Sequence, residues 1–384
     1  MKKYLLLLVF CLIIDIAYSL ELKGNIETKY KTDSLNNEDG KYIDEDEKYN
    51  GYFDINGNID LDLENNFHLM NTFELRPIQK RVYDGNYGNH KPIPNNSTLT
   101  DDFYGKENYL KRKLHFNHYS AVIEELYFKY KEEAFLFGIG KFNPNFGYAH
   151  DKNRLSGVYG TRLVDEYALK EKIGTFIAFD SDFFVLRGDF FFDDRTFLSE
   201  DFFQRRGINK SKYGAGNTKK LNNFSVTSEL IYDTERIYAS IRRLAVTNVD
   251  ERAEKGYLIG YQNYIEQKEH EFGLNPLVEV AYLENFNGNN GRDVVFTTLS
   301  LPFFYKGWNF IGSYTLKNDD EKFYKDYISY IVQASIGYEF KNGLTVDVAR
   351  KWEKSAKKVS DMINSKEIKY YDSWGVDVGY NFKF

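Results

Sequence analysis

The sequence predicts an all-β chain that forms a single antiparallel β-barrel of about sixteen strands crossing a membrane. Two observations predict this fold. The first is a period-two alternation of apolar and polar residues, which is typical of strands with one apolar face and recurs along the chain. The second is the spacing between these alternating runs, which is long and short in turn from the first run to the last.

Composition excludes several other classes of protein. The chain has 384 residues, of which 17% are aromatic and only one is Cys. A mean hydropathy of −0.56, with no long apolar run after residue 18, excludes a helical membrane bundle. The aromatic content is too high for a disordered chain, and one Cys cannot form a disulfide scaffold. The net charge of −6 argues against nucleic acid as a partner, because phosphate binding needs a basic surface.

Residues 1–19 resemble a secretory signal peptide. Lys2 and Lys3 precede a short apolar stretch from Tyr4 to Ile14, and Ala17-Tyr18-Ser19 places small residues at the cleavage positions. The apolar stretch is too short to span a membrane as a helix. We therefore expect two parts, a signal peptide at 1–19 and a barrel domain at 20–384.

The C-terminus has the clearest alternation in the chain. Every second residue from Trp374 is apolar, and the residues between are polar or Gly. The apolar members are Trp374, Val376, Val378, Tyr380, Phe382 and Phe384. A similar pattern covers residues 53–63 and resumes at Phe67 after Asn65-Asn66, which is a hairpin signal.

Sixteen strands follow from the full set of alternating runs. We expect them at 20–32, 50–64, 67–76, 112–130, 134–143, 162–179, 183–192, 221–232, 237–245, 256–265, 270–282, 293–304, 308–316, 327–340, 344–352 and 369–384. The short connections are 65–66, 131–133, 180–182, 233–236, 266–269, 305–307 and 341–343. The long ones are 33–49, 77–111, 144–161, 193–220, 246–255, 283–292, 317–326 and 353–368. An even-stranded antiparallel barrel places all connections of one kind at one end, so the loop lengths support the alternation.

Two of these strands carry an irregularity. His118 and Glu124 interrupt the apolar face of 112–130, which predicts a β-bulge or an extension above the membrane. Pro276 lies inside 270–282, where it needs a bulge or a position that donates no hydrogen bond. The alternative to a membrane barrel is a soluble β-sandwich. The charged inner faces and the aromatic residues near strand ends favour the barrel.

The last eight residues, Asp377-Val378-Gly379-Tyr380-Asn381-Phe382-Lys383-Phe384, resemble the C-terminal assembly signal of bacterial outer-membrane proteins. That pattern has a polar residue, Gly, an aromatic residue and a terminal Phe, which are here Asp377, Gly379, Phe382 and Phe384. The resemblance implies export to a Gram-negative outer membrane, contact with its lipid and recognition by the barrel-assembly machinery. It also implies that the short turns are periplasmic and the long loops extracellular.

A second stretch, residues 138–147, is similar to the strand that leads into the third outer loop of phosphate-selective-type porins. In sixteen-stranded porins this loop folds into the lumen and narrows it, and trimers are usual. The resemblance therefore implies a constriction after the fifth strand and a homotrimer. The candidate constriction residues combine that loop with charged residues at lumen positions: Lys141, Asp151, Lys152, Arg154, Arg187, Asp189 and Arg242.

No pattern of catalytic, cofactor-binding or metal-ligating residues is identifiable. The six His residues form no nucleophile–base constellation, and His115 and His118 fall on opposite faces of one strand. No Gly-rich phosphate loop joins a strand to a helix. We therefore expect no catalytic residues, no metal and no cofactor.

Two functional hypotheses remain. Sixteen strands enclose more space than side chains can fill, so the first is an outer-membrane porin for passive diffusion of small hydrophilic solutes or ions. The second is a surface adhesin or structural barrel that binds a partner through its long loops. An outer-membrane hydrolase is a third, weaker candidate.

Overall fold

The computed structural model describes residues 22–37, 49–63, 65–77, 119–149, 157–159, 162–194, 196, 198, 215–247, 252–267, 272–321, 324–358 and 366–384. The predicted signal peptide at 1–19 lies outside the described residues, as do most of the loops at 77–111 and 193–220. Among the described residues, no helix is long and apolar enough to cross a membrane.

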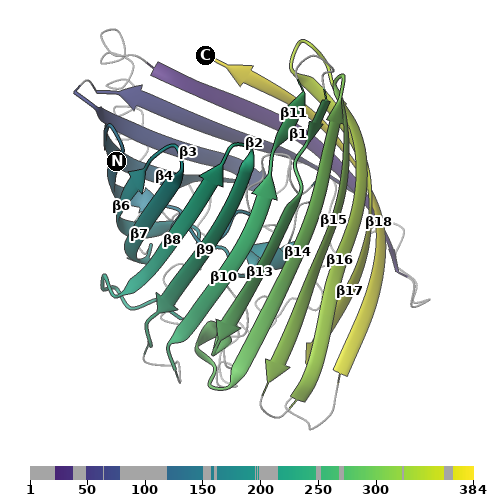
Figure 1. The fold of residues 1–384 in the computed structure, drawn as a ribbon. Coiled ribbons are helices and arrows are strands. Elements are labelled where there is room, and N and C mark those ends of the chain that lie inside the picture. Colours follow the sequence, from purple (N-terminus) through teal and green to yellow (C-terminus); the bar gives the residue numbers. More distant parts are fainter. Residues whose placement is uncertain are drawn as a thin grey trace.

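The described chain is a closed antiparallel barrel (Figure 1). Its strands are β1 (Leu22–Asn37), β2 (Tyr49–Asp62), β3 (Phe67–Pro77), β4 (Tyr119–Glu132), β5 (Phe135–Phe142), β6 (Lys172–Asp180), β7 (Phe184–Asp193), β8 (Asn223–Tyr232), β9 (Glu235–Leu244), β10 (Glu254–Asn263), β11 (Ile265–Gln267), β12 (Phe272–Leu274), β13 (Leu277–Glu284), β14 (Arg292–Tyr305), β15 (Trp308–Glu321), β16 (Tyr324–Glu339), β17 (Leu344–Lys358) and β18 (Lys366–Lys383). Each strand pairs with its neighbours around the barrel, and β1 pairs with both β2 and β18.

The barrel has the sixteen strands that the sequence predicts, because two hairpin arms are each interrupted once. β10 and β11 form one arm, broken at Tyr264, and β12 and β13 form the other, broken at Asn275 and Pro276. The pairing with β14 keeps its register across the second break, from Leu274 to Leu277. Pro276 therefore occupies a position without a ladder donor, as the sequence predicts.

The bulge predicted in the fourth strand is present. Thr72 pairs with Glu125 and the next residue of β3 pairs with Ile123, so Glu124 is the extra residue in β4. The bulge turns Glu125 into the lumen, where its carboxylate accepts a hydrogen bond from Thr72 Oγ1 at 3.0 Å.

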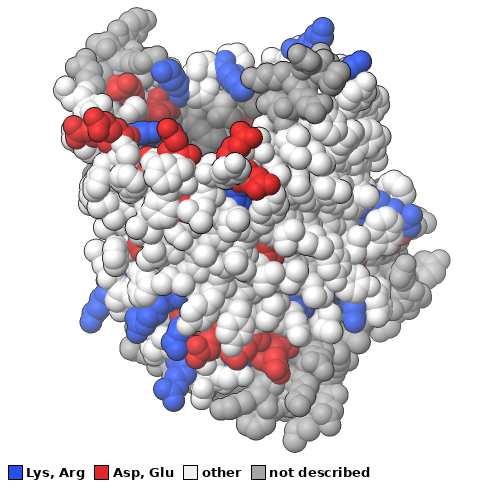
Figure 2. Space-filling view, viewed as in Figure 1, with Lys and Arg blue, Asp and Glu red and all other residues white. Residues whose placement is uncertain are grey.

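The two faces of the barrel wall differ as the alternation predicts. On β18 the apolar members from Trp374 to Phe384 are 37–52% exposed, whereas Ser373 and Asp377 on the other face are 1% and 6% exposed. The same holds for Val332 and Gln333 on β16, of which Gln333 is buried. Figure 2 shows a wide uncharged band on the outer surface, with charged side chains gathered towards the two ends of the barrel. The outer surface therefore suits a hydrocarbon layer.

The last strand closes the barrel through backbone contacts at its final residue. Phe384 N donates to Gly24 O and Gly24 N donates to Phe384 O, both at 3.0 Å. A Cβ on Gly24 would lie 2.7 Å from the Phe384 ring, so this contact needs Gly. Asp377 and Gly379 lie on the inner face of β18, and Phe382 and Phe384 lie on the outer face.

Several predicted strand limits are wrong. The sixth strand begins at Lys172 rather than at residue 162, and Arg162–Asp165 forms a one-turn helix, α4, in its place. In the β15–β16 hairpin the strands reach Glu321 and Tyr324, so the expected ten-residue loop at 317–326 is mostly strand. Similarly, β17 extends to Lys358. Alternation ends where side chains rise above the apolar band, but backbone pairing continues beyond it.

Candidate functional site in the barrel lumen

Part of the connection between β5 and β6 lies inside the barrel. We call residues 143–149, 157–159 and 162–171 the inward segment; these are its described residues. Its apolar side chains pack with inner residues of β7, β9, β10, β13, β14 and β16 into one buried cluster. The members from the segment are Phe146, Ala149, Leu163, Val164, Tyr167 and Leu169. Burial of these side chains accounts for the inward course of the segment.

Glu279 of β13 joins the two halves of the inward segment to the wall. Its carboxylate accepts hydrogen bonds from Tyr148 N at 2.7 Å and Ala149 N at 3.3 Å. It also accepts one from the Tyr167 hydroxyl and one from the Tyr238 hydroxyl of β9, the latter at 2.8 Å. Burial, with the negative charge of Glu279 beside it, raises the pKa of the Tyr167 phenol well above its usual value. Tyr167 therefore keeps its proton and remains a donor to this carboxylate.

Two glycines let the segment approach the wall. Gly147 has φ +83°, and a Cβ there would lie 2.6 Å from Glu279 Oε2 and 2.6 Å from Leu258 Cδ1. Gly157 has φ +66°, and a Cβ there would lie 2.6 Å from Gln333 Nε2. Both positions thus require a residue without a side chain, for backbone conformation and for space.

Further along, the segment reaches a different part of the wall. Tyr159 N donates to Gln333 Oε1 of β16 at 2.7 Å, and the ammonium of Lys351 on β17 lies 5.0 Å from the Tyr159 ring centre. Glu166 then pairs with Lys317 of β15 at 2.5 Å. The Tyr159 hydroxyl also lies against Gly375 of β18, where an added Cβ would be 2.8 Å from it. The segment therefore contacts strands from β7 round to β18, and it narrows that side of the lumen.

Two of the predicted lumen cations lie beside the inward segment. Arg187 of β7 pairs with Asp189 at 2.8 Å, and Asp189 accepts a hydrogen bond from Asn145 N of the segment at 3.2 Å. The Arg187 guanidinium also lies 4.2 Å from the centre of the Phe176 ring. Arg187 and Asp189 are therefore a coupled pair at the start of the inward segment.

The second is Arg242 of β9, which pairs with Glu254 of β10 at 2.5 Å. It also donates to the carbonyl oxygen of Tyr167 and lies over the Phe146 ring at 4.4 Å. Arg242 is 5% exposed. Its contacts with Glu254 on the wall and with Tyr167 and Phe146 of the segment hold the segment against the wall.

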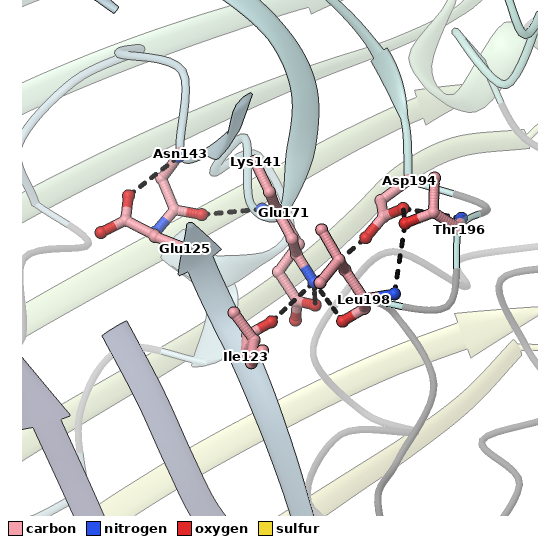
Figure 3. Close-up of polar contacts among 8 residues, drawn as sticks. All are labelled: Ile123, Glu125, Lys141, Asn143, Glu171, Asp194, Thr196 and Leu198. Atoms are coloured by element: carbon pink, nitrogen blue, oxygen red, sulfur yellow. Dashed lines mark hydrogen bonds and ion pairs between the residues drawn. The ribbon is translucent and has the colours of Figure 1, made fainter. Parts of the chain in front are cut away.

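Lys141 lies in a separate cluster (Figure 3). It shares the outward face of β5 with Ile139 and is 1% exposed. Its ammonium donates to the carbonyl oxygens of Ile123 and Leu198 at 2.7 and 3.1 Å. It also pairs with the carboxylates of Glu171 and Asp194, at 3.0 and 3.2 Å.

This cluster ties the β4 bulge to the loops on either side of β6 and β7. Asn143 joins it, accepting from Glu171 N at 2.7 Å and donating its own backbone N–H to Glu125 at 3.0 Å. The structure therefore does not bring Lys141 together with Arg187, Asp189 and Arg242. The other three candidate constriction residues, Asp151, Lys152 and Arg154, lie outside the described residues.

The part of the wall formed by β1, β2 and β3 carries inward charges of both signs. Lys31 lies 4.0 Å from Asp54 and 3.7 Å from Asp377, and Lys29 pairs with Glu27 at 2.7 Å. The side chains of Lys29 and Glu27 are 23% and 32% exposed. Lys29 and Glu27 therefore present partly hydrated charges to the lumen, whereas Asp54 is only 3% exposed.

The period-two alternation of the predicted strand 270–282 puts Glu279 on the polar, inner face, but the sequence does not show which groups its carboxylate binds. Tyr148 and Glu279 are 131 positions apart, and no local pattern relates them. Within the described part of the chain, no group of three or more His, Cys, Asp or Glu side chains is placed to hold a metal ion.

The fold is similar to solved structures of bacterial outer-membrane proteins, porins among them. A loop-deletion mutant of OmpT of Vibrio cholerae aligns with 95% of this chain and 100% of its own, at 10% identity and a TM-score of 0.51. The outer-membrane channel DcaP of Acinetobacter baumannii aligns with 94% of this chain and 97% of its own, at 10% identity and a TM-score of 0.53. A mutant of the Rh. blastica porin aligns with 94% of this chain and 100% of its own, at 11% identity and a TM-score of 0.50.

No protein-family model matches the sequence, and no curated protein matches it. The likeness therefore lies in the fold, which is that of a sixteen-stranded porin-like barrel, as the sequence predicts.

Proposed function

We propose that this protein is an outer-membrane porin that forms a water-filled channel for passive diffusion of small hydrophilic solutes or ions. The observation that carries the proposal is a sixteen-stranded barrel whose outer surface is apolar and whose inner wall is polar and charged. A barrel of this size encloses more volume than its own side chains fill. Charges along such a wall orient polar solutes and bias ion passage.

The inward segment supports a constriction. It crosses from β7 to β18 and is held by buried contacts, so it narrows the channel without depending on a ligand. We propose Arg187, Asp189 and Arg242 as wall residues beside this constriction, and Asp151, Lys152 and Arg154 as members of its loop. Reversal of charge at Arg154 is the test of that loop: Arg154→Glu shifts ion selectivity towards cations if the loop lines the constriction.

Export, assembly and oligomeric state belong to the same proposal. The signal peptide at 1–19 directs the chain out of the cytoplasm, and Asp377, Gly379, Phe382 and Phe384 form the signal read by the barrel-assembly machinery. A homotrimer is supported by one solved relative of this fold, a trimer form of OmpT of Vibrio cholerae. The proposal includes no catalytic step and no cofactor.

Planar-bilayer conductance of the purified protein tests the function. Stepwise, ohmic current increments on insertion are the expected result. A silent bilayer containing correctly folded barrels would contradict the porin proposal and favour the adhesin hypothesis, which depends on the loops at 77–111 and 193–220.

A further inference from the structure

An ion pair lies on the outward face of the barrel. Arg350 of β17 and Asp372 of β18 alternate with buried inner residues such as Ala349 and Ser373, which are 2% and 1% exposed. The outward neighbours Val348 and Trp374 are 37% and 48% exposed. Arg350 and Asp372 therefore point away from the lumen.

The geometry of the pair is well defined. Arg350 Nε donates to Asp372 Oδ1 at 3.0 Å, and an Nη donates to Oδ2 at 2.7 Å, which is a bidentate arrangement. The guanidinium carbon lies 4.8 Å from the Trp352 ring centre and 5.2 Å from that of Trp374. The Asp372 side chain is 13% exposed, whereas that of Arg350 is 38% exposed. The cation is therefore the more accessible member.

A second cation and more aromatic rings extend this patch. Lys354 pairs in register with Tyr330 of β16 and with Tyr370 of β18, and its ammonium lies 6.0 Å from the Tyr330 ring centre. We define the outer patch by its members: Tyr330, Arg350, Trp352, Lys354, Tyr370, Asp372 and Trp374. It holds two cations and one carboxylate among aromatic side chains.

The patch lies at the end of the barrel that carries the long loops. Leu344, at the turn end of β17, pairs with Tyr380 among the outward aromatic residues there. Ten residues separate Leu344 from Lys354, and at ~3.3 Å per residue on a strand tilted by ~40° they rise about 25 Å. This is the height of the apolar band of such barrels, so Lys354 lies at its rim. The backbone of Arg350 lies about 10 Å below the rim, but its guanidinium binds Asp372, which pairs in register with Trp352 and so lies about 5 Å below the rim.

We propose that the outer patch binds the phosphate headgroup of a membrane lipid. The inference rests on the proposed membrane position of the barrel, but not on its channel activity. An ion pair that faces hydrocarbon is costly, and an anion at the headgroup level stabilises its cation. Lys354 gives the patch a surplus positive charge, which a phosphate complements. Trp and Tyr rings at this depth pack against the adjoining acyl chains.

Two unmodified tryptophans allow a test on the wild-type protein. The chain has three Trp residues; Trp352 and Trp374 belong to the patch, and Trp308 lies at the short-turn end of β15. The barrel is reconstituted in phosphatidylcholine vesicles with brominated phosphatidic acid or brominated phosphatidylcholine at equal mole fraction. We expect at least twofold stronger quenching of Trp fluorescence by brominated phosphatidic acid. Equal quenching by the two lipids would overturn the proposal.

Variants assign the effect to the patch. In Arg350→Gln/Lys354→Gln the preference for phosphatidic acid should fall at least fivefold. Lys255→Gln is the matched control, because Lys255 is also outward and paired, 3.1 Å from Glu284, but lies on β10. An unchanged preference in the double variant would refute the assignment. Loss of an oligomer without any lipid preference would show a subunit interface instead. Single-channel conductance of the same samples reports separately on the proposed porin function.

Discussion

Glu279 accepts four hydrogen bonds at the contact between the inward segment and the barrel wall. The carboxylate can accept all four because it has two oxygens and no donor. A Gln side chain keeps one acceptor oxygen and introduces an NH₂ donor, which opposes the donors already present. The shape of the site is retained while its hydrogen bonding is lost.

We therefore predict that Glu279→Gln loosens the inward segment. Hydrogen bonds to a charged group contribute about 1.5–3 kcal/mol each, so a loss of roughly 2–4 kcal/mol is expected in urea unfolding. Single-channel currents should also become noisier. Glu27→Gln serves as the control, because the ion pair of Glu27 with Lys29 is partly exposed. Equal behaviour of the two variants would refute the role given to Glu279.

Lys141 offers a second prediction on a single residue. Lys141→Met removes a buried ammonium and leaves the carboxylates of Glu171 and Asp194 without it. Breaking a buried ion pair from one side costs about 3–5 kcal/mol, so the unfolding midpoint in urea should fall clearly. Ion selectivity should not change, since the Lys141 ammonium lies apart from the lumen residues Arg187, Asp189 and Arg242. A shift in reversal potential with unchanged stability would instead support the sequence-based placement of Lys141 at the constriction.

At the level of elements, alternation predicts strand existence better than strand ends. Alternation found all sixteen strands and the two faces of β18. It could do so because one face of each strand has an apolar environment outside the barrel and the other face does not. It failed at residues 162–171, where apolar residues such as Leu163 and Val164 fill the lumen rather than face lipid. Apolar side chains that pack inside a barrel cannot be told from lipid-facing ones by their sequence alone.

The faces of the strands lead to a matched pair of substitutions. Val378→Arg places a charge on the lipid side of β18, where Val378 is 38% exposed, and should cost about 2–4 kcal/mol. Asn56→Arg places the same charge on the lumen side of β2, opposite Glu27 and Glu74 in register, and should cost much less. The fraction of heat-resistant barrel on a gel measures both. Equal losses would show that the assignment of the two faces is wrong.

For the whole molecule, closure could be predicted because it follows from local patterns and from the alternating loop lengths. The filling of the lumen could not, since it depends on contacts across the barrel between residues far apart in the chain, such as Tyr159 with Gln333, 174 positions apart. The inward segment contacts the wall from β7 to β18. On another part of the wall, the side chains of Lys29 and Glu27 of β1 are 23% and 32% exposed, so we expect ions to pass along β1, β2 and β3.

The charge of the inner wall at β1, β2 and β3 predicts the ion preference of the channel. Among the inward side chains of β1, β2 and β3 that the structure describes, carboxylates outnumber lysines: Glu27, Asp54, Asp60, Asp62 and Glu74 against Lys23, Lys29 and Lys31. The low-dielectric barrel wall concentrates the resulting negative field in the pore. We expect the reversal potential in a KCl gradient to have the sign of cation preference.

Reversing charge on this wall should move that potential towards zero. Glu27→Lys/Asp60→Lys changes two inward carboxylates to cations, whereas Glu284→Lys makes the same kind of change on the outer surface, where Glu284 is 36% exposed. Because the Debye length falls from about 10 Å at 0.1 M salt to about 3 Å at 1 M, the preference should weaken as the concentration of KCl rises. A reversal potential that responds equally to the inner and outer substitutions would mean that the ions do not pass along β1, β2 and β3.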